Sequence, residues 1–287
     1  MRLARDRKLS IFKVCLMICG LLAWAGAGLA ADAGALPAGD WNRSNLERIK
    51  VPAGEALTFA VLGDNRSNPA VFEAVLKSLD QEPGLAFAID VGDLVESGSP
   101  ETFADFLSRV RRHLRLPLLT VIGNHDLDQA RNSALYRGIF GPDHYAFQIK
   151  DNYFIVINDV EPDGEPDWGW LEAELTKSQA YQTRLVFLHI PLFDPREGKK
   201  PHCLPEAAGA RLLELFSRYR VTRIFAGHIH GYFDGTWDGV PYTITAGAGA
   251  PLYGTDPEHY FYHYLKVTLE GGKVRTQVRR ISVEGRP

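Results

Sequence analysis

The chain has 287 residues, of which 45% are hydrophobic and 23% are charged, and its formal net charge is −3 at pH 7. This composition can bury a full hydrophobic core, and the absence of any internal repeat or low-complexity tract excludes a repeat protein. After processing, one domain of roughly 200–250 residues fits the usual range for α/β folds.

The first 30 residues have the layout of a secretory signal peptide. Four basic residues within the first eight precede an uncharged apolar segment at 14–29, which ends in small residues. This order is typical of export signals, and we expect cleavage after Ala30 or Ala33 and release to the periplasm or the exterior. The alternative is an uncleaved membrane anchor, because the apolar segment approaches the length that spans a bilayer.

The remainder of the chain is acidic and poor in cysteine. Residues 1–30 hold five basic residues and one acidic residue, so that 27 basic and 34 acidic residues remain and give a formal charge of −7. A general nucleic-acid binder would carry a clustered basic face, and we expect no nucleic-acid partner. Cys203 is the single cysteine left, which excludes an intramolecular disulfide, so stability must rest on the core and on any bound metals.

The first half of the fold is predicted to alternate strands with helices. Residues 31–56 are rich in proline and glycine and are predicted to be a linker, which leaves 57–287 as the folded domain. Apolar strands are predicted at 57–62 and 85–89. Helices are predicted to follow them, one beginning at Asn68-Pro69 and one at Ser99-Pro100, because a polar cap followed by proline is a helix-start signal.

The middle of the chain is predicted to add a third strand and a hairpin. The strand covers 118–122, and residues 129–140 are predicted to be a helix or an irregular arm. Apolar runs at 145–149 and 153–157 form the hairpin, which turns at 151–152. A helix at 168–177 follows, since its apolar residues recur at helical spacing.

The last third returns to strands. A strand at 185–188 precedes a loop at 191–205, a helix at 207–219 and a strand at 223–226. Residues 239–281 alternate short β runs with glycines, and a Gly-Gly pair between two such runs predicts a closing hairpin. We expect two β-sheets face to face, with helices outside.

Five of the predicted strands end in polar side chains that can bind metals. The residues that follow them are Asp64, Asp93, Asn124 with His125 and Asp126, His189, and His228 with His230. Ligands bind at the carboxyl ends of strands in α/β sheets, so these side chains are expected to meet. Carboxylates and neutral imidazoles are the inventory that a two-metal hydrolytic centre needs.

The order of these motifs resembles the calcineurin-like metallophosphoesterase superfamily. The resemblance covers about 57–230 and rests on Gly63-Asp64, Gly92-Asp93, the segment 123–126, His189 and the segment 227–230. It implies a four-layer α/β/β/α sandwich of two mixed sheets flanked by helices. It also implies an enzyme that hydrolyses a phosphomonoester or phosphodiester through a hydroxide that bridges two divalent cations.

The resemblance also implies a division of the ligands between two cations. Asp93 would bridge both ions, because one carboxylate can bind two cations. Asp64 and His230 would complete one site, and Asn124, His189 and His228 the other. The donor set suits Mn, Fe or Zn and does not decide among them. Outside the resemblance, His189 has no motif of its own, and a plain turn histidine is the alternative.

Two residues beside the ligands are implied to take part in catalysis. His125 would face the substrate and protonate the leaving oxygen as the general acid. Asn124 would contact the substrate in addition to the metal. Asp126 would orient the His125 imidazole from behind, as carboxylates next to metal sites do. A helix or turn cap is the equal alternative for Asp126.

The chain departs from the family at Arg66. Members commonly carry Asp-x-His in the first motif, whereas here the match is Asp64-Asn65-Arg66, and a guanidinium cannot bind a cation. Arg66 could grip the substrate phosphate, Glu96 could supply the missing donor, or the centre could work with one tight metal. We favour the first alternative and predict Arg66 as a substrate contact.

The motifs indicate a phosphate ester but do not specify which one. An exported, acidic protein favours a small phosphorylated molecule or a lipid head group. The loop 191–205 carries enough positive charge to hold an anionic group, although a solvated loop explains that charge equally well. The alternative function is a metal-binding or partner-binding module of the same fold that has weak or lost catalysis.

Overall fold

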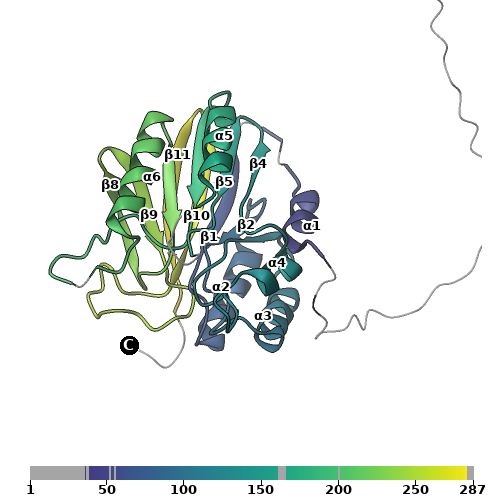
Figure 1. The fold of residues 1–287 in the computed structure, drawn as a ribbon. Helices are drawn as coiled ribbons and strands as arrows, with labels where there is room; N and C mark the ends of the chain where they lie inside the picture. Colours follow the sequence, from purple (N-terminus) through teal and green to yellow (C-terminus); the bar gives the residue numbers. More distant parts are fainter. Residues whose placement is uncertain are drawn as a thin grey trace, which may run out of the picture. The chain divides into compact units, whose positions relative to one another are not determined.

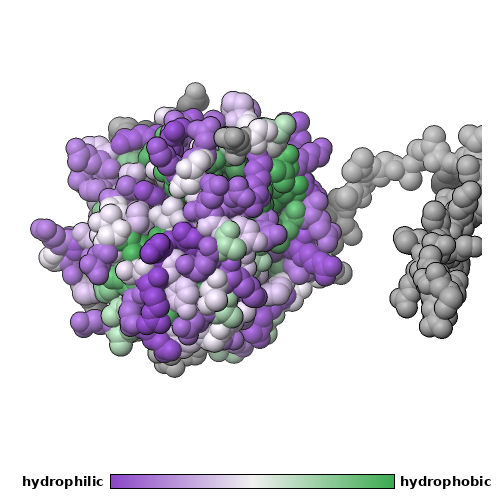
Figure 2. Space-filling model, turned by 90° about the horizontal axis from the view of Figure 1, so that it is seen from above, coloured by the Kyte–Doolittle hydropathy of each residue, from purple (hydrophilic) through white to green (hydrophobic). Residues whose placement is uncertain are grey.

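The computed structural model describes residues 36, 39–51, 53–54, 56–160, 166–199 and 201–282. The predicted signal peptide, residues 1–30, and its expected cleavage positions lie outside the described residues. Among the residues that are described, no helix has both the length and the apolar character needed to cross a bilayer. The face drawn in Figure 2 is predominantly hydrophilic, with smaller groups of hydrophobic residues between the polar ones.

The first sheet has five strands in the order β11-β10-β1-β2-β3. Strands β1, β2 and β3 run parallel, with β3 at the edge, and β10 joins β1 antiparallel, with Val61 opposite both Ile89 and Leu265. The strands are β1 (Leu57–Leu62), β2 (Ala88–Asp90), β3 (Leu118–Thr120), β10 (His263–Glu270) and β11 (Lys273–Arg280). β10 and β11 form the hairpin that the Gly-Gly pair predicts.

The second sheet has six strands in the order β4-β5-β6-β7-β9-β8. β5, β6, β7 and β9 run parallel, and the edge strands β4 and β8 join them as antiparallel hairpins. The strands are β4 (Tyr145–Ile149), β5 (Asn152–Val156), β6 (Thr183–Phe187), β7 (Arg223–Ala226), β8 (Tyr232–Trp237) and β9 (Val240–Thr245). β8 was not predicted, because its glycine and polar residues interrupt the apolar pattern.

The two sheets pack face to face through a cluster of phenylalanines. Along β1 the side chains alternate: Phe59 faces the other sheet, whereas Ala60 and Leu62 face the helices, as the two-residue period of a strand requires. Phe59 stacks on Phe87 with ring centroids 5.0 Å apart, and Phe187 stacks on Phe225 at 5.2 Å. This buried layer fixes the sheets against each other.

Helices cover the outer face of each sheet (Figure 1). α2 (Pro69–Gln81), α3 (Pro100–His113) and α4 (Ala134–Phe140) pack on the first sheet, and α5 (Trp168–Ser178) and α6 (Glu206–Arg218) on the second. The predicted four-layer α/β/β/α sandwich is therefore confirmed.

The two predicted helix starts are confirmed by their caps. The Asn68 side chain accepts a hydrogen bond from Val71 N at 3.4 Å. Ser99 and Thr102 form a capping box, in which the Ser99 hydroxyl accepts from Thr102 N at 3.2 Å and Ser99 N donates to Thr102 Oγ1 at 3.1 Å. Both caps satisfy backbone donors that the first helical turn would leave unpaired.

The prediction of a linker over 31–56 is wrong for its central part, which forms helix α1 (Trp41–Arg48). α1 lies along the open edge of β3. Asn42 Oδ1 accepts from Thr120 N at 2.9 Å, Asn45 Oδ1 accepts from Leu118 N at 3.3 Å, and Trp41 Nε1 donates to Leu118 O at 2.8 Å. The helix escaped prediction because the residues buried on it are Asn42 and Asn45, which do not form an apolar stripe.

Candidate metal centre

The predicted ligands lie in the loops that directly follow five parallel strands. Asp64 follows β1, Asp93 follows β2 and Asn124 follows β3, while the histidines follow β6 and β7 of the other sheet. Backbone hydrogen bonds tie neighbouring loops together: Asp64 N donates to Gly92 O, and Gly227 N donates to His189 O, both at 2.9 Å. The packing of the sheets thus brings the five loops to one place.

Three of the ligand residues have left-handed backbone conformations. φ is 58° at Asp64, 58° at Asp93 and 69° at His228. Such angles are uncommon for residues with a side chain, although Asp, Asn and His tolerate them best. They turn each chain sharply away from its strand and aim the side chain inward, and strained conformations of this kind concentrate at functional sites.

Glycines allow the loops after β2 and β3 to touch. A Cβ at Gly123 would lie 2.1 Å from Asp93 N, and a Cβ at Gly92 would lie 2.8 Å from Gly123 N. Gly92 also has φ = +99°, where other residues are strained. Only glycine lets these two loops approach closely enough to bring Asp93 beside Asn124.

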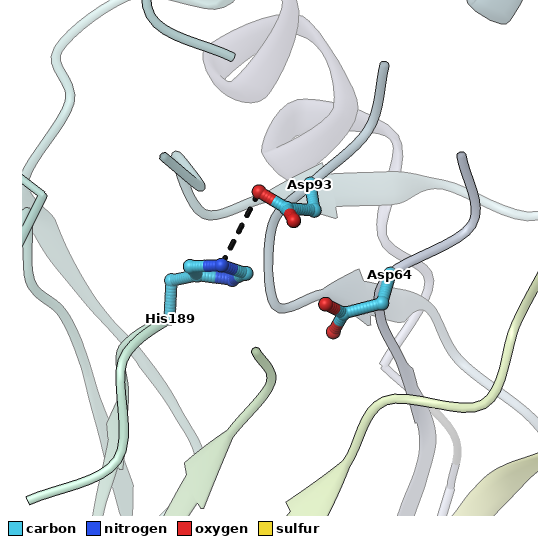
Figure 3. A group of neighbouring side chains, drawn as sticks. All are labelled: Asp64, Asp93 and His189. Carbon is cyan, nitrogen blue, oxygen red and sulfur yellow. Dashed lines mark ion pairs between the residues drawn. The ribbon is translucent and has the colours of Figure 1, made fainter. Parts of the chain in front are cut away.

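Asp64, Asp93 and His189 form the centre of the cluster. Figure 3 shows their side chains pointing toward one another, and one ligand atom from each lies within 4.8 Å of the others. All three are buried. Asp93 Oδ1 lies 3.2 Å from His189 Nε2. Buried carboxylates at this spacing require a positive charge nearby, which a cation, a protonated histidine or an arginine can supply.

The set predicted for one cation is fully assembled. His189 Nε2 lies 3.1 Å from Asn124 Oδ1, 3.2 Å from Asp93 Oδ1 and 3.2 Å from His228 Nδ1. The other ring nitrogen of His189 is 2.9 Å from Val91 O, which fixes the ring so that Nε2 faces the cluster. A carboxylate oxygen, an amide oxygen and two imidazole nitrogens therefore converge, and this donor set fits a divalent cation such as Mn, Fe or Zn.

The set predicted for the other cation contains a guanidinium. His230 Nε2 lies 3.4 Å from Asp64 Oδ1, as a shared ligand site requires. However, Arg66 Nε donates to Asp93 Oδ2 at 3.1 Å, and Arg66 Nη2 lies 3.5 Å from His230 Nε2. Asp93 and His230, two of the three residues of this set, thus lie next to a side chain that is itself positively charged.

Glu96 does not serve as the replacement donor that one of our alternatives required. Its carboxylate accepts from Arg66 Nη1 at 3.0 and 3.2 Å and from the Ser67 hydroxyl. The interaction with Ser67 and the charge of Arg66 lower the pKa of Glu96. Glu96 therefore anchors Arg66.

The charges of Asp93 and His189 depend on each other. Burial disfavours the ionised form of Asp93, yet the neighbouring His189 holds its pKa well below the ordinary value. Burial likewise disfavours a charged His189, but attraction to Asp93, Asp64 and Asp159 raises its pKa. A cation at His189 Nε2 would compete with a proton for that nitrogen.

His125 lies beside the cluster in a fixed orientation. Its backbone N donates to Asp93 Oδ1 at 3.0 Å, and its ring Nδ1 lies 2.7 Å from Glu96 O. The carbonyl accepts a hydrogen bond, so Nδ1 carries a proton and Nε2 is the nitrogen that can exchange a proton with a substrate.

The contacts of Asp126 do not support the first of our two equal alternatives, in which it orients His125. Its buried carboxylate accepts backbone hydrogen bonds from Gly123 N at 2.7 Å, Asp93 N at 3.1 Å and Val95 N at 3.2 Å. The turn-cap alternative is the one that these contacts support. Burial and the charge of Asp93 raise the pKa of Asp126, whereas the three N–H donors favour its ionised form.

Asp159 is a further residue of the site that sequence reasoning missed. It follows β5 as Asp64 follows β1, and its carboxylate accepts from His189 N at 3.2 Å and from Ile190 N at 2.8 Å. The signal was present, because β5 is an apolar strand that ends in Asn158-Asp159. It carried no family motif and was passed over.

Part of the loop 191–205 reaches the ligands. The His202 ring stacks on the His228 ring with centroids 4.0 Å apart, and Tyr253 lies against His230 at 4.1 Å. Arg196, one of the positive charges of the loop, pairs with Asp194 at 2.7 Å and lies over the Tyr253 ring. The loop therefore contributes aromatic contacts to the rim of the site.

Comparisons with known proteins agree with this geometry. A family model described as Calcineurin-like phosphoesterase matches residues 57–232. The serine/threonine-protein phosphatase CPPED1 of Danio rerio is 29% identical over 194 residues, which cover 60% of this chain and 62% of that protein. The 3',5'-cyclic adenosine monophosphate phosphodiesterase CpdA of Escherichia coli is 29% identical over 190 residues, covering 63% and 66%. The chain thus spans less than two thirds of these relatives.

Solved structures show the same fold at low identity. A purple acid phosphatase from yellow lupin superposes with a TM-score of 0.62 at 14% identity, over 80% of this chain and 52% of that one. A dimetal phosphatase from Danio rerio superposes with a TM-score of 0.53 at 16% identity, over 80% of this chain and all of that one.

Proposed function

The chain belongs to the calcineurin-like phosphoesterase family, and from that membership we propose that it hydrolyses a phosphomonoester or phosphodiester with the help of a bound divalent cation. The observation that carries the proposal is the convergence of Asp93, Asn124 and His228 on His189 Nε2, with His125 beside them. The phosphatase and phosphodiesterase relatives support a metal-dependent phosphoric ester hydrolase.

A bound cation at Asp93, Asn124, His189 and His228 would activate water and neutralise charge on the phosphoryl oxygens. The residues around it hold the geometry. Val91 O orients His189, and the Asp159 carboxylate fixes the backbone at His189 and Ile190. These contacts support an oriented set of donors in the loops that follow the strands.

His125 is proposed to protonate the leaving oxygen. In its protonated form the ring donates Nδ1–H to Glu96 O and Nε2–H to the substrate. Once the Nε2 proton is transferred, the Nδ1–H tautomer keeps its hydrogen bond, so that the ring stays in place throughout the cycle. General acid catalysis of this kind contributes about 10²–10⁴-fold to a rate.

Arg66 and Asn124 are proposed to face the substrate. The guanidinium of Arg66 would place a fixed positive charge beside the phosphoryl group. Asn124 turns its carbonyl oxygen to His189, and its amide N–H₂ group would then be available to a phosphoryl oxygen.

The substrate is proposed to be a small phosphorylated molecule or a lipid head group. The named activities of the relatives include hydrolysis of phosphoproteins and of a cyclic nucleotide, so both monoesters and diesters enter the first assays. The acidic balance of residues 31–287 argues against nucleic acid as a partner.

Export is proposed on the layout of residues 1–30 alone. The N-terminal residues of protein isolated from its native source would test it. A first residue near 31 supports export with cleavage, an intact N-terminus in a membrane fraction supports the anchored alternative, and an intact N-terminus in the cytoplasmic fraction contradicts export.

The hydrolase proposal is tested with aryl monoester and diester phosphates in the presence of Mn²⁺. We expect turnover by the wild-type chain and a loss of about 10²-fold or more in His125→Ala, with bound metal retained. His113→Ala is the matched control, because His113 lies on α3 next to Glu73. If His125→Ala hydrolyses at the wild-type rate, the assigned mechanism is wrong.

The alternative function is a metal-binding or partner-binding module with weak or lost catalysis. The guanidinium among the ligands of one cation site is the observation that favours it. A wild-type chain that binds Mn²⁺ tightly but turns over none of the phosphate esters would support this alternative over hydrolysis.

A further inference from the structure

Arg66 occupies the inside of one of the two predicted cation sites. Its side chain is 12% exposed and extends from the loop after β1 into the space between Asp93, Glu96 and His230. Contacts to the loop after β2, through Asp93 and Glu96, and to the loop after β7, through His230, hold it there, so its position belongs to the site and not to the solvent-exposed rim.

The two carboxylate oxygens of Asp93 have different partners. Oδ1 lies 3.2 Å from His189 Nε2 and 3.0 Å from His125 N, on the side of the assembled donor set. Oδ2 accepts from Arg66 Nε at 3.1 Å. Asp93 is therefore placed to bridge two positive charges. Oδ1 faces the donor set for a cation, and Oδ2 already binds the guanidinium of Arg66.

The ligand nitrogen of His230 is also engaged. His230 Nδ1 lies 2.7 Å from Pro251 O, so Nδ1 carries the proton and Nε2 carries the lone pair. That lone pair faces Arg66 Nη2 at 3.5 Å. A cation bound to Asp64 and His230 would therefore have to remove Arg66 from the nitrogen that it needs.

Arg66 is also held through its third guanidinium nitrogen, Nη1. Its Nη1 donates to both oxygens of Glu96 at 3.0 and 3.2 Å, and Glu96 is held in turn by Ser67. To admit a cation, the side chain would have to break its ion pairs with Asp93 and Glu96 together. Because a guanidinium stays protonated, its charge would also repel the incoming ion.

We propose that the Arg66 guanidinium takes the place of one of the two cations, so that this chain binds a single divalent cation at Asp93, Asn124, His189 and His228. The inference rests on the proposed function, which it deepens. A fixed guanidinium can neutralise Asp93 and donate hydrogen bonds to a phosphoryl group, but it cannot dissociate or exchange. The activity of the centre would therefore depend on the binding of one cation and not of two.

The test counts metal in purified full-length chain after Mn²⁺ loading and removal of free ions. We expect one equivalent per chain in the wild type and in Arg66→Lys, which keeps a positive charge at the position. Arg66→His restores the residue that the family commonly carries there, and we expect two equivalents and the electron paramagnetic resonance signal of a coupled Mn(II) pair. Arg109→His is the matched control, since Arg109 pairs with Asp105 and Glu73 on the helices; it should keep one equivalent.

Several outcomes would overturn the inference. A wild-type chain that holds two equivalents, or none, contradicts a single-cation centre directly and does not depend on any variant being folded. A folded Arg66→His chain that still holds one equivalent would show that Arg66 is not what excludes the second ion. Circular dichroism establishes whether each variant is folded.

Metal counting separates this inference from the proposed function. One equivalent without turnover of any phosphate ester would leave the single-cation centre standing and refute hydrolysis. Two equivalents with turnover would refute the single-cation centre and support hydrolysis. Both results are read from the same wild-type preparation.

Discussion

The carboxylate of Asp126 accepts a hydrogen bond from the backbone N of Asp93 at 3.1 Å, so a buried acid outside the predicted ligand set positions the central ligand residue. The same carboxylate binds Gly123 N and Val95 N. One side chain thus connects the loops after β2 and β3, which together provide Asp93 and Asn124.

Replacing Asp126 with asparagine should destabilise the fold. The amide keeps one acceptor oxygen and turns an N–H₂ group toward backbone N–H groups that need acceptors. We expect the free energy of unfolding to fall by roughly 1–3 kcal/mol, measured by urea denaturation. Asp238→Asn is the control, because Asp238 lies in the β8–β9 turn with φ = 45°, which asparagine tolerates. Equal stability of the two variants would contradict this account of Asp126.

Replacing Asp159 with asparagine should weaken metal binding. The carboxylate holds His189 N and Ile190 N, and an amide can accept from one of them while opposing the other. Residues that support metal ligands in this way typically change metal affinity by about 10–100-fold. Titration calorimetry with Mn²⁺ measures the effect, and Asp151→Asn, on the exposed β4–β5 turn, serves as the control. Unchanged affinity would show that the His189 backbone needs no such support.

Two glycine substitutions should have opposite effects on stability. A Cβ at Gly123 would lie 2.1 Å from Asp93 N, so Gly123→Ala must push the two loops apart; we expect a loss of about 1–3 kcal/mol and weaker Mn²⁺ binding. A Cβ at Gly138 on α4 would meet nothing within 4 Å, and alanine there should raise the free energy of unfolding by about 0.5–1 kcal/mol. Thermal unfolding of both variants tests the contrast.

Acid should destabilise the protein through His263. This side chain is fully buried, its Nε2 lies 3.1 Å from Thr245 Oγ1, and burial lowers its pKa to about 4. The folded protein therefore disfavours the charged form that the unfolded chain adopts below pH ~6.5. The stability is present above pH ~6.5 and is lost as the pH falls toward 4, by about 3 kcal/mol in all.

Denaturation by urea at a series of pH values between 7 and 4 checks the His263 prediction. His263→Gln should remove much of the slope in this range, whereas His113→Gln on α3 should keep it. A wild-type chain whose stability does not change between pH 6.5 and 4.5 would contradict the role assigned to His263.

The site residues at the ends of the strands were predictable, because a buried apolar run changes there directly into polar side chains. An apolar run such as 57–62 has to be inside, and the aspartate two residues later has to satisfy its charge, so the sequence alone indicates a site. The same reasoning would have found Asp159. The partners of Arg66 were not predictable, because they depend on how closely the loops of Asp93 and Glu96 approach it in three dimensions.

The contacts of Asp126 and of α1 were not predictable, for a shared physical reason. Asp126 was expected to act on His125, its sequence neighbour, but its carboxylate turns back to the backbone of its own loop and of the loop after β2. α1 lies in the predicted linker, and its hydrogen bonds to β3 come from two asparagines and the indole N–H of Trp41. Polar side chains that satisfy backbone groups leave no periodic pattern in a sequence.

The position of α1 has a consequence for the association of the protein with itself. Asn42 and Asn45 occupy N–H groups of β3 that a strand from another molecule could otherwise pair with. A chain cut after Arg48 would uncover that strand while the rest of the sandwich stayed closed. Such a fragment should oligomerise or aggregate, whereas a chain that begins at Gly39 should stay monodisperse.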